Sequence, residues 1–189
     1  MSLSSYLDQH NCNIIEGYSK TCNREVILLQ LLCQNKQNIL EIGFNAGHSA
    51  NLFLYINPTS NVLSFDIGEH DYIKIGKEYI DKTYPNRHTL IIGDSTKTIP
   101  IYETTIKYDV IFIDGGHSYE VAKADLLNCK KFAHKDTIVI MDDTMYSKVW
   151  EKDWTIGPTK AWLECNIITE ISHIDFEEGR GISWGTYLL

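Results

Sequence analysis

The fold of this chain is decided by the stretch Asn38-Ile39-Leu40-Glu41-Ile42-Gly43-Phe44-Asn45-Ala46-Gly47-His48-Ser49. An apolar run ends at an acidic residue, a turn with two glycines follows, and a helix-like segment continues to Ile56. This order predicts a buried strand that turns sharply into a helix, whose first N–H groups can bind a ligand. The spacing Glu-x-Gly-x-x-x-Gly lacks the Gly-x-Gly-x-x-Gly pattern of dinucleotide-binding turns, and Glu41 places negative charge where a phosphate would sit. The turn therefore favours a ligand with an amino group and an adenosine, although a strand–turn–helix without a ligand has the same pattern.

The composition is that of an ordinary globular protein. The 189 residues are enough for one domain with a core, and 43% of them are apolar. A formal net charge of -8 argues against nucleic acid or an anionic membrane as a partner. No apolar run approaches the roughly 20 residues of a membrane span, and the polar segment Met1–Asn11 has no signal-peptide core. Five cysteines without a Cys-x-x-Cys pair predict free thiols in a reducing, cytoplasmic compartment.

Strand and helix patterns alternate almost to the end of the chain. Runs that are apolar throughout, such as Val110–Ile113 and Ile138–Met141, predict strands that are buried on both faces, as in a doubly wound parallel sheet. Strands are expected at Asn38–Gly43, Val62–Gly68, Thr89–Asp94, Tyr108–Gly115 and Thr137–Asp143, and helices at Arg24–Gln34, Ser49–Ile56, Asp71–Tyr84, Ser95–Ile101, Tyr119–Ala133 and Gly157–Asn166. Two final strand-like runs, Ile167–Phe176 and Ile182–Leu189, flank a glycine-containing turn and predict an antiparallel hairpin.

The ends of the five expected parallel strands all carry acidic residues, at the edge of the sheet where such folds bind ligands. These acids are Glu41, Asp66, Asp94, Asp114 and the pair Asp142-Asp143. At the tip of the second strand, Asp66 is placed to accept hydrogen bonds from two ribose hydroxyls. One strand further out, Asp94 and Ser95 could bind an adenine edge. Each aspartate taken singly could instead cap a helix, because Asp is a favoured N-cap residue.

Three of these acids, Asp114, Asp142 and Asp143, are expected at adjacent strand ends. Neighbouring strands lie roughly 4.8 Å apart, and carboxylates that close repel one another unless a cation neutralises them. Oxygen ligands alone favour Mg²⁺, with Mn²⁺ or Ca²⁺ as alternatives. Successive strand residues point to opposite faces, so Asp142 and Asp143 can share an ion only if the chain has left the strand at Asp143.

Taken together, these segments resemble the class I S-adenosylmethionine-dependent methyltransferases. Within that class the chain is similar to the small metal-dependent O-methyltransferases, and most of all to the branch that methylates sugar hydroxyls and is related in fold to the catechol O-methyltransferases. The resemblance runs from about Asn38 to Leu189. It is carried by Leu40–Gly47, Phe65-Asp66, Gly93-Asp94-Ser95, Phe112–Tyr119 and Met141-Asp142-Asp143.

The resemblance implies an α/β, Rossmann-like, doubly wound sheet of seven strands in the order 3-2-1-4-5-7-6, mostly parallel with an antiparallel C-terminal hairpin. It implies one domain, in which residues 1–37 form a helical cover and residues 38–189 form the core. The cofactor S-adenosylmethionine is expected at Glu41, Gly43, Asn45, Gly47, Asp66, Asp94, Ser95 and Asp114. A divalent ion is expected on Asp114, Asp142 and Asp143, and His117 is expected to act as general base beside Asp114.

The acceptor is the least determined part of the function. Catechol-type enzymes usually carry Asp-Asn where this chain has Asp142-Asp143, and a lysine near His117, so the resemblance favours a small polyhydroxylated acceptor such as a sugar. The loop Met145–Thr155 contains Tyr146, Trp150 and Trp154, which could stack on a sugar ring or form a dimer contact.

Several alternatives stay open. His117 could merely cap the helix that begins near Tyr119. A methyltransferase that acts on a catechol-like phenol or on nitrogen would also fit the first motif, and in an N-methyltransferase the acids could serve only as helix caps. A nucleotide- or NAD-binding Rossmann enzyme fits less well, because the third glycine is missing and there is no second catalytic domain.

Overall fold

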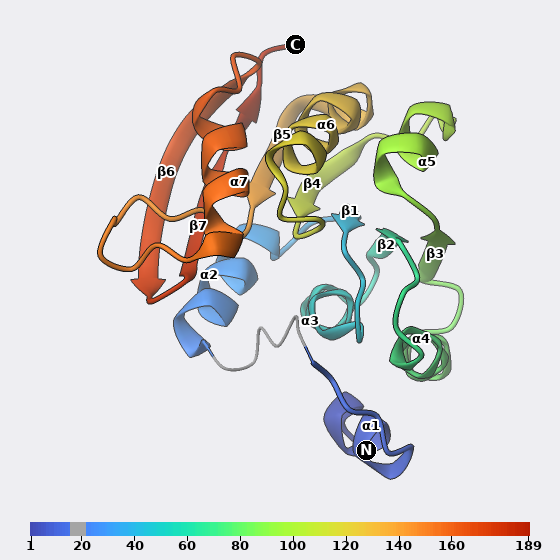
Figure 1. Ribbon diagram of the computed structural model, residues 1–189. Coiled ribbons are helices and arrows are strands. Elements are labelled where there is room, and N and C mark those ends of the chain that lie inside the picture. The colour runs from blue at the N-terminus through green and yellow to red at the C-terminus, as the bar shows by residue number, and fades with distance from the viewer. Residues whose placement is uncertain (16–21) are drawn as a thin grey trace.

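In the computed structural model, which describes residues 1–15 and 22–189, seven strands form one sheet (Figure 1). The strands are β1 (Asn38–Ile42), β2 (Asn61–Asp66), β3 (His88–Ile92), β4 (Tyr108–Ile113), β5 (Ala133–Met141), β6 (Ile168–Glu177) and β7 (Arg180–Tyr187). Their order across the sheet is β3-β2-β1-β4-β5-β7-β6, and β7 runs antiparallel to both of its neighbours. The expected Rossmann-like sheet, its order and its C-terminal hairpin are confirmed.

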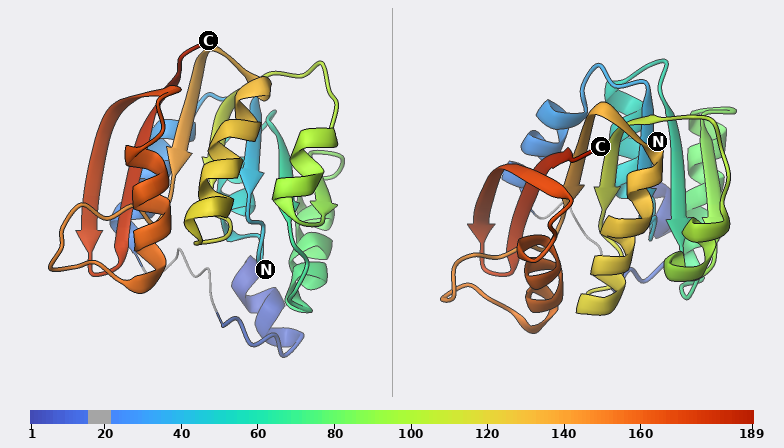
Figure 2. Two further views of the ribbon diagram at one scale, coloured as in Figure 1. Left: turned by 45° about the horizontal axis from the view of Figure 1, so that its top comes forward. Right: turned by 90° about the horizontal axis from the view of Figure 1, so that it is seen from above.

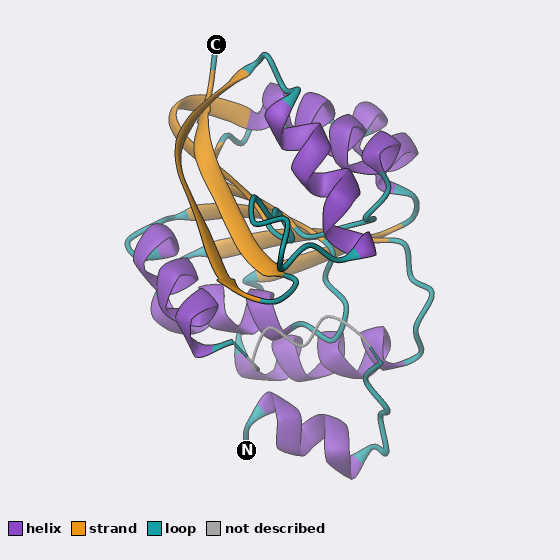
Figure 3. Cartoon of the chain, turned by 60° about the vertical axis from the view of Figure 1, so that its left-hand side comes forward, coloured by secondary structure: helices purple, strands orange, loops and turns teal. Residues whose placement is uncertain are grey.

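Helices cover both faces of this sheet (Figure 3). One face carries α2 (Asn23–Cys33), α3 (His48–Ile56) and α4 (Tyr72–Thr83). The other carries α5 (Ser95–Ile101), α6 (Tyr119–Cys129), the 3-10 turn η2 (Lys130–Phe132) and α7 (Asp153–Leu163), which lie side by side in Figure 2. Adjacent residues of one strand pack on opposite faces of the sheet: Ile39 packs on the face covered by α2, α3 and α4, and Leu40 packs on the face covered by α5, α6 and α7. The central strands are therefore apolar on both faces, as the sequence predicts.

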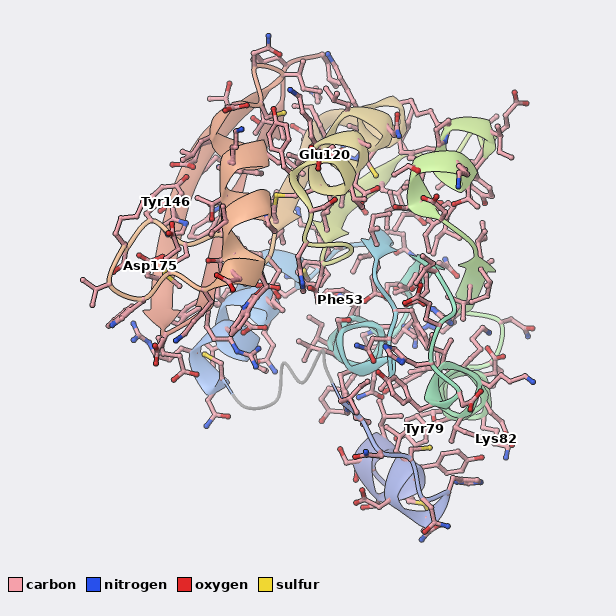
Figure 4. The ribbon with its side chains drawn as sticks, in the orientation of Figure 1. Phe53, Tyr79, Lys82, Glu120, Tyr146 and Asp175 are labelled. Atoms are coloured by element: carbon pink, nitrogen blue, oxygen red, sulfur yellow. The ribbon has the colours of Figure 1, made fainter. Side chains whose placement is uncertain are left out.

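The first helix, α1 (Leu3–Gln9), lies within the expected helical cover of residues 1–37, although the sequence predicted no separate helix at these residues. A helix of seven residues is marginal in isolation, so α1 depends on its contact with α4. Tyr79 donates a hydrogen bond to the carbonyl of Met1 at 3.1 Å, and Lys82 donates one to the Tyr6 hydroxyl at 3.0 Å; Figure 4 labels both α4 side chains beside α1. Residues 16–21, which belong to the expected helical cover, lie outside the described residues.

The starts of two elements differ from expectation by four residues, for local reasons. Helix α7 starts at Asp153, four residues before Gly157, because Thr155 fixes its first turn: the Thr155 hydroxyl accepts a hydrogen bond from the Lys152 amide at 3.1 Å, and the Thr155 amide donates one to the Lys152 carbonyl at 2.9 Å. Strand β5 starts at Ala133 and not at Thr137, and its pairing with β4 shifts register between Tyr108 and Val110. Neither feature follows from apolar periodicity. Within the described ranges, no helix is long and apolar enough to cross a membrane, and all five cysteines are free thiols.

The packing of α2 can be tested with two leucines on the same helix. Leu29 is 1% exposed and belongs to the core, whereas Leu31 is 60% exposed. We expect Leu29→Ala to lower the free energy of unfolding by about 2–5 kcal/mol, because a buried side chain is replaced by a cavity. The control Leu31→Ala should change it by less than about 0.5 kcal/mol. Urea titrations of both variants measure the difference, and equal losses would show that α2 is not docked as described.

Candidate functional site

The turn between β1 and α3 is shaped by neighbouring protein atoms. A β-carbon on Gly43 would lie 1.9 Å from the carbonyl oxygen of Asp114, so β1 and β4 can approach this closely only with glycine there. Gly47 has φ +84° at the start of α3, and a β-carbon on it would lie 2.8 Å from the Phe44 ring. Both glycines adopt backbone conformations that L side chains rarely adopt. The turn is thus fixed before any ligand arrives.

Asp66, at the end of β2, holds this turn in place. Its Oδ2 accepts hydrogen bonds from the backbone N–H groups of Phe44 at 3.0 Å and Asn45 at 2.8 Å, while its Oδ1 accepts one from Gly68 at 2.8 Å. A carboxylate offers about four acceptor positions, so capacity for one further donor remains. Asp66 is only half-buried and does not cap α4, whose N-cap is Asp71.

Glu41 lies behind the turn and not on its open side. It is fully buried, and its carboxylate accepts hydrogen bonds from the Ser49 and Ser64 hydroxyls, each at 2.5 Å. Burial raises the pKa of Glu41 to about 7, against the opposing effect of the two hydroxyls. His88 on β3 lies 2.9 Å from Ser64 and stacks on Phe44 at 4.9 Å between ring centroids. In this arrangement Glu41 can influence a ligand only through Ser49 or through the turn.

The end of β3 is occupied by a helix cap. Asp94 accepts hydrogen bonds from the backbone and the hydroxyl of Thr96 and pairs with Lys97 at 2.8 Å, so its side chain begins α5. Its neighbour Ser95 lies close to Asp125, a fully buried carboxyl on α6. Burial raises the pKa of Asp125 to about 7, and the Ser95 hydroxyl opposes that rise.

An acidic cluster forms beyond β4 and β5. Asp114, His117 and Asp143 each offer one ligand atom, and these three atoms lie within 4.8 Å of one another. His117 Nε2 lies 2.8 Å from Asp143 Oδ2. A cavity of about 10 Å³ adjoins the cluster and is lined by its three residues and Asp142, among others. That volume is about the space of one water molecule or one small ion.

Asp142 and Asp143 occupy different positions in this cluster. Strand β5 ends at Met141, and Asp143 has φ +55°, so the chain has left the strand at the residue where a shared ion requires it. Asp143 turns toward His117, whereas Asp142 stays buried and accepts a hydrogen bond from the Asp143 amide at 2.8 Å. Burial and the neighbouring carboxylates raise the pKa values of Asp114 and Asp142 well above their usual range. The fit with a divalent cation is good, because a cation would relieve this repulsion.

His117 is not the helix cap that its position could suggest. Ser118 caps α6 by accepting a hydrogen bond from the Val121 amide at 3.2 Å. The His117 side chain is 43% exposed, and α7 presses on the same turn, since a β-carbon on Gly157 would lie 2.1 Å from the His117 carbonyl oxygen. The imidazole is thus held at the rim of the cluster by Asp143 and is partly exposed to solvent.

Comparison with known proteins assigns this arrangement to a family. Residues 40–144 match a family described as a methyltransferase domain, and the match covers more than half of the chain. The chain belongs to this methyltransferase family. The expected class I methyltransferase is therefore confirmed, and the segments at the ends of β1 to β5 are the matched part.

Solved structures show the same fold at low sequence identity. A putative O-methyltransferase from Klebsiella pneumoniae has a TM-score of 0.75 and 15% identity, over 98% of this chain and 89% of that one. An O-methyltransferase from Bacillus cereus in complex with S-adenosylhomocysteine has a TM-score of 0.71 and 17% identity, over 97% of this chain and 90% of that one. The N-methyltransferase NodS from Bradyrhizobium japonicum, also with S-adenosylhomocysteine, has a TM-score of 0.66 and 12% identity, over the full length of both chains.

In this methyltransferase the hairpin fixes the segment after Asp143. The Thr144 amide donates to the Gly181 carbonyl at 3.1 Å, and Asp175 on β6 accepts hydrogen bonds from the amides of Tyr146 at 3.1 Å and Ser147 at 2.9 Å. The His173 Nε2 atom lies within hydrogen-bond distance of the Asp175 Oδ1 atom, at 2.7 Å. Figure 4 shows Tyr146 and Asp175 together beside the hairpin.

The aromatic residues of the segment 145–155, which was expected to be a loop and whose last three residues begin α7, separate into two kinds. Tyr146 stacks on His173 with ring centroids 3.6 Å apart, so one face of its ring is already covered. Trp150 is 40% exposed and Trp154 is 45% exposed. Trp154 also donates a hydrogen bond to the Gly179 carbonyl at 3.3 Å. Only the two tryptophans present substantial open aromatic surface.

Two charged residues beside the acids, Glu25 and Arg180, were not predicted from the sequence to belong to the site. Glu25 on α2 is 1% exposed, and Arg180 at the start of β7 lies 3.5 Å from it. The charge of Glu25 contributes to the raised pKa values of Asp114 and Asp142. One signal could have revealed Glu25, because it is spaced four and eight residues before the buried Leu29 and Cys33 and so lies on the core-facing side of the helix.

Proposed function

We propose that this protein transfers a methyl group from S-adenosylmethionine to a hydroxyl oxygen of a small polyhydroxylated acceptor, with a divalent cation at the acidic cluster. The observation that carries the proposal is the group Asp114, His117 and Asp143, whose ligand atoms lie within 4.8 Å of one another directly beside the Gly43 turn. A methyl-donor turn beside such a cluster favours transfer to oxygen, because a hydroxyl needs both orientation and removal of its proton.

The cofactor fits the turn between β1 and α3. S-adenosylmethionine supplies a sulfonium methyl group, which is electrophilic without an acid catalyst. Asp66 has acceptor capacity left for a ribose hydroxyl, and Gly43, Asn45 and Gly47 form the turn beside it. Glu41 would act by fixing the Ser49 hydroxyl. Asp94 and Ser95 would border the adenine, with the buried carboxyl of Asp125 close to Ser95.

The cation would be held by Asp114 and Asp143, with Asp142 supporting them from its buried position. Mg²⁺, Mn²⁺ or Ca²⁺ suits these oxygen donors, and such an ion would orient two acceptor oxygens and lower the pKa of the hydroxyl. The sheet fixes the backbone of Asp114 and Asp142. The Asp114 amide donates a hydrogen bond to the Ile42 carbonyl of β1, and the Asp142 amide donates one to the Ile113 carbonyl of β4, each at 2.9 Å.

We assign the role of proton acceptor to His117. Asp143 holds its Nε2 at 2.8 Å, and its side chain is exposed at the rim, where an acceptor would enter. During transfer, the acceptor oxygen forms its bond to the methyl carbon, the carbon–sulfur bond breaks, and the hydroxyl proton passes to His117. Water then removes the proton from the exposed ring.

A sugar or another small polyol is the proposed acceptor class. The rim of the site offers His117 and the acids, whose carboxylates accept hydrogen bonds from hydroxyls. The exposed Trp150 follows in the adjoining loop, and the exposed Trp154 lies in the first turn of α7. The five free thiols favour a reducing, cytoplasmic setting. An N-methyltransferase with the same fold is the alternative, and the metal dependence of turnover separates the two.

The cofactor assignment is tested at Asp66. We expect Asp66→Ala to weaken binding of S-adenosylhomocysteine by at least about 10-fold, because charged hydrogen bonds to the ribose are lost and the turn loses its anchor. Asp71→Ala is the control, since Asp71 is a nearby exposed acid that makes no capping hydrogen bond. Isothermal titration calorimetry measures both affinities. Unchanged affinity in Asp66→Ala would place the cofactor elsewhere.

The cation assignment is tested by chelation. EDTA should abolish turnover and added Mg²⁺ or Mn²⁺ should restore it, while binding of S-adenosylhomocysteine stays largely intact, because the cation acts on the acceptor side. Asp143→Ala should behave like permanent chelation, whereas Asp136→Ala, an exposed acid near the other end of β5, should not. Full turnover in excess EDTA would remove the acidic cluster from catalysis.

The role of His117 is tested by its removal. His117→Ala should lower turnover by roughly 100-fold or more, the usual scale of a general base, and leave the affinity for S-adenosylhomocysteine nearly unchanged. His134→Ala is the matched control, since His134 also pairs with an aspartate, Asp109, but lies near the start of β5, away from the cluster. Near-normal turnover in His117→Ala, measured by product formation, would mean that His117 is not the base.

A further inference from the structure

The buried carboxylate of Glu25 has an unusual place in the molecule. Glu25 is 1% exposed and begins the stripe of α2 that continues with the buried residues Leu29 and Cys33. An apolar residue at this position would continue the stripe without the penalty of burying a charge. A carboxylate buried at this position therefore needs a hydrogen-bond donor or a positive charge, which the apolar residues of the stripe do not supply.

The hydrogen-bonding capacity of Glu25 is unfilled in the described part of the chain. Neither Oε1 nor Oε2 accepts a hydrogen bond that meets ordinary geometry, and its ion pair with Arg180 is loose, at 3.5 Å. Buried acceptors are nearly always satisfied in native proteins. Two open acceptors on one buried carboxylate thus indicate that donors are supplied by something that binds here.

The surroundings of Glu25 identify the kind of donor. The negative charges of Asp143 and Glu177 act on Glu25, and the charge of Glu25 acts in turn on Asp114 and Asp142. Among the described residues these carboxylates outnumber Arg180, the guanidinium that pairs with Glu25. The excess of negative charge fits a divalent cation. The three-residue group whose ligand atoms lie within 4.8 Å of one another does not include Glu25, so its oxygens lie further out than a direct ligand.

We propose that Glu25 accepts hydrogen bonds from water molecules bound to a divalent cation at Asp114 and Asp143, and that the cation thereby fastens α2 to the site. This rests on the proposed function, which places the cation there. Mg²⁺ keeps several of its waters in protein sites, and each water brings two donors. Carboxylates that receive such hydrogen bonds orient the ion and raise its affinity. Glu25 is in these terms a positioning residue and not a catalytic one.

The location of α2 gives this contact a consequence. The helix is also attached to the hairpin, because Arg24 donates to the Phe176 carbonyl at 3.4 Å and its guanidinium lies 5.7 Å from the centre of the Phe176 ring. Figure 1 shows α2 beside β7, on the sheet face opposite α6 and α7. Cation binding would therefore join three parts of the chain: the ends of β4 and β5, the hairpin, and α2.

The test compares Glu25→Gln with the wild type at pH 8. In EDTA, Glu25→Gln should unfold at a higher temperature than the wild type, because one of the mutually repelling carboxylates is gone. Its affinity for Mg²⁺, measured by calorimetry, should fall by about 10-fold or more. The control Glu103→Gln removes the same charge from an exposed loop after α5 and should change neither quantity. A lower unfolding temperature in EDTA with unchanged Mg²⁺ affinity would overturn the proposal and make Glu25 only the ion-pair partner of Arg180.

Hydrogen exchange on the wild type provides a second measurement that needs no variant. Mg²⁺ should slow exchange at the amides of α2, as well as near Asp143. Protection near Asp143 without protection of α2 would overturn this inference but leave the cation site of the proposed function intact. If the wild type binds no Mg²⁺ at all, both this inference and the cation in the proposed function fail.

Discussion

The close approach of β1 and β4 at Gly43 is the constraint on which the rest of the site depends. With no β-carbon at Gly43, the Asp114 carbonyl can occupy that space, and the Asp114 amide bonds to Ile42 at 2.9 Å. The turn proposed to bind the cofactor and the carboxylate proposed to face the acceptor are therefore built on one strand pairing. A methyltransferase needs its donor and acceptor held in line, and here a single backbone contact relates the two halves.

Unbalanced negative charge is the second organising feature. Asp114, Asp142 and Glu25 are buried or half-buried near one another, and burial together with mutual repulsion raises the pKa of all three. Such a cluster costs stability, and the apolar layers on both faces of the sheet offset that cost. Strain of this kind is typical of functional sites, where the unfavourable arrangement is what a ligand later relieves.

The hairpin does more than close the edge of the sheet. Through Asp175 and Gly181 it accepts hydrogen bonds from the amides of the segment after Asp143, and through Phe176 and Arg180 it contacts α2. Its pairing with β5 runs from Met141 to Ile138, directly before the acids. The position of Asp143 is thus set from both sides, by β4 through the parallel ladder and by β6 and β7 through the loop.

The sequence by itself determined the sheet, the helices of its two layers and the edge at which the acids gather, because apolar periodicity and strand-terminal acids are local signals. It also identified Asp114, Asp143 and His117 as neighbours, since parallel strands bring their carboxyl ends together. Only the tertiary structure decided which acids face outward: Asp143 turns out through a positive φ, Glu41 turns inward to two serines, and Asp94 caps a helix. It alone brought Glu25 to the cluster, because the contact between α2 and the strand ends joins residues about 90 to 120 positions apart, and no local pattern encodes that distance.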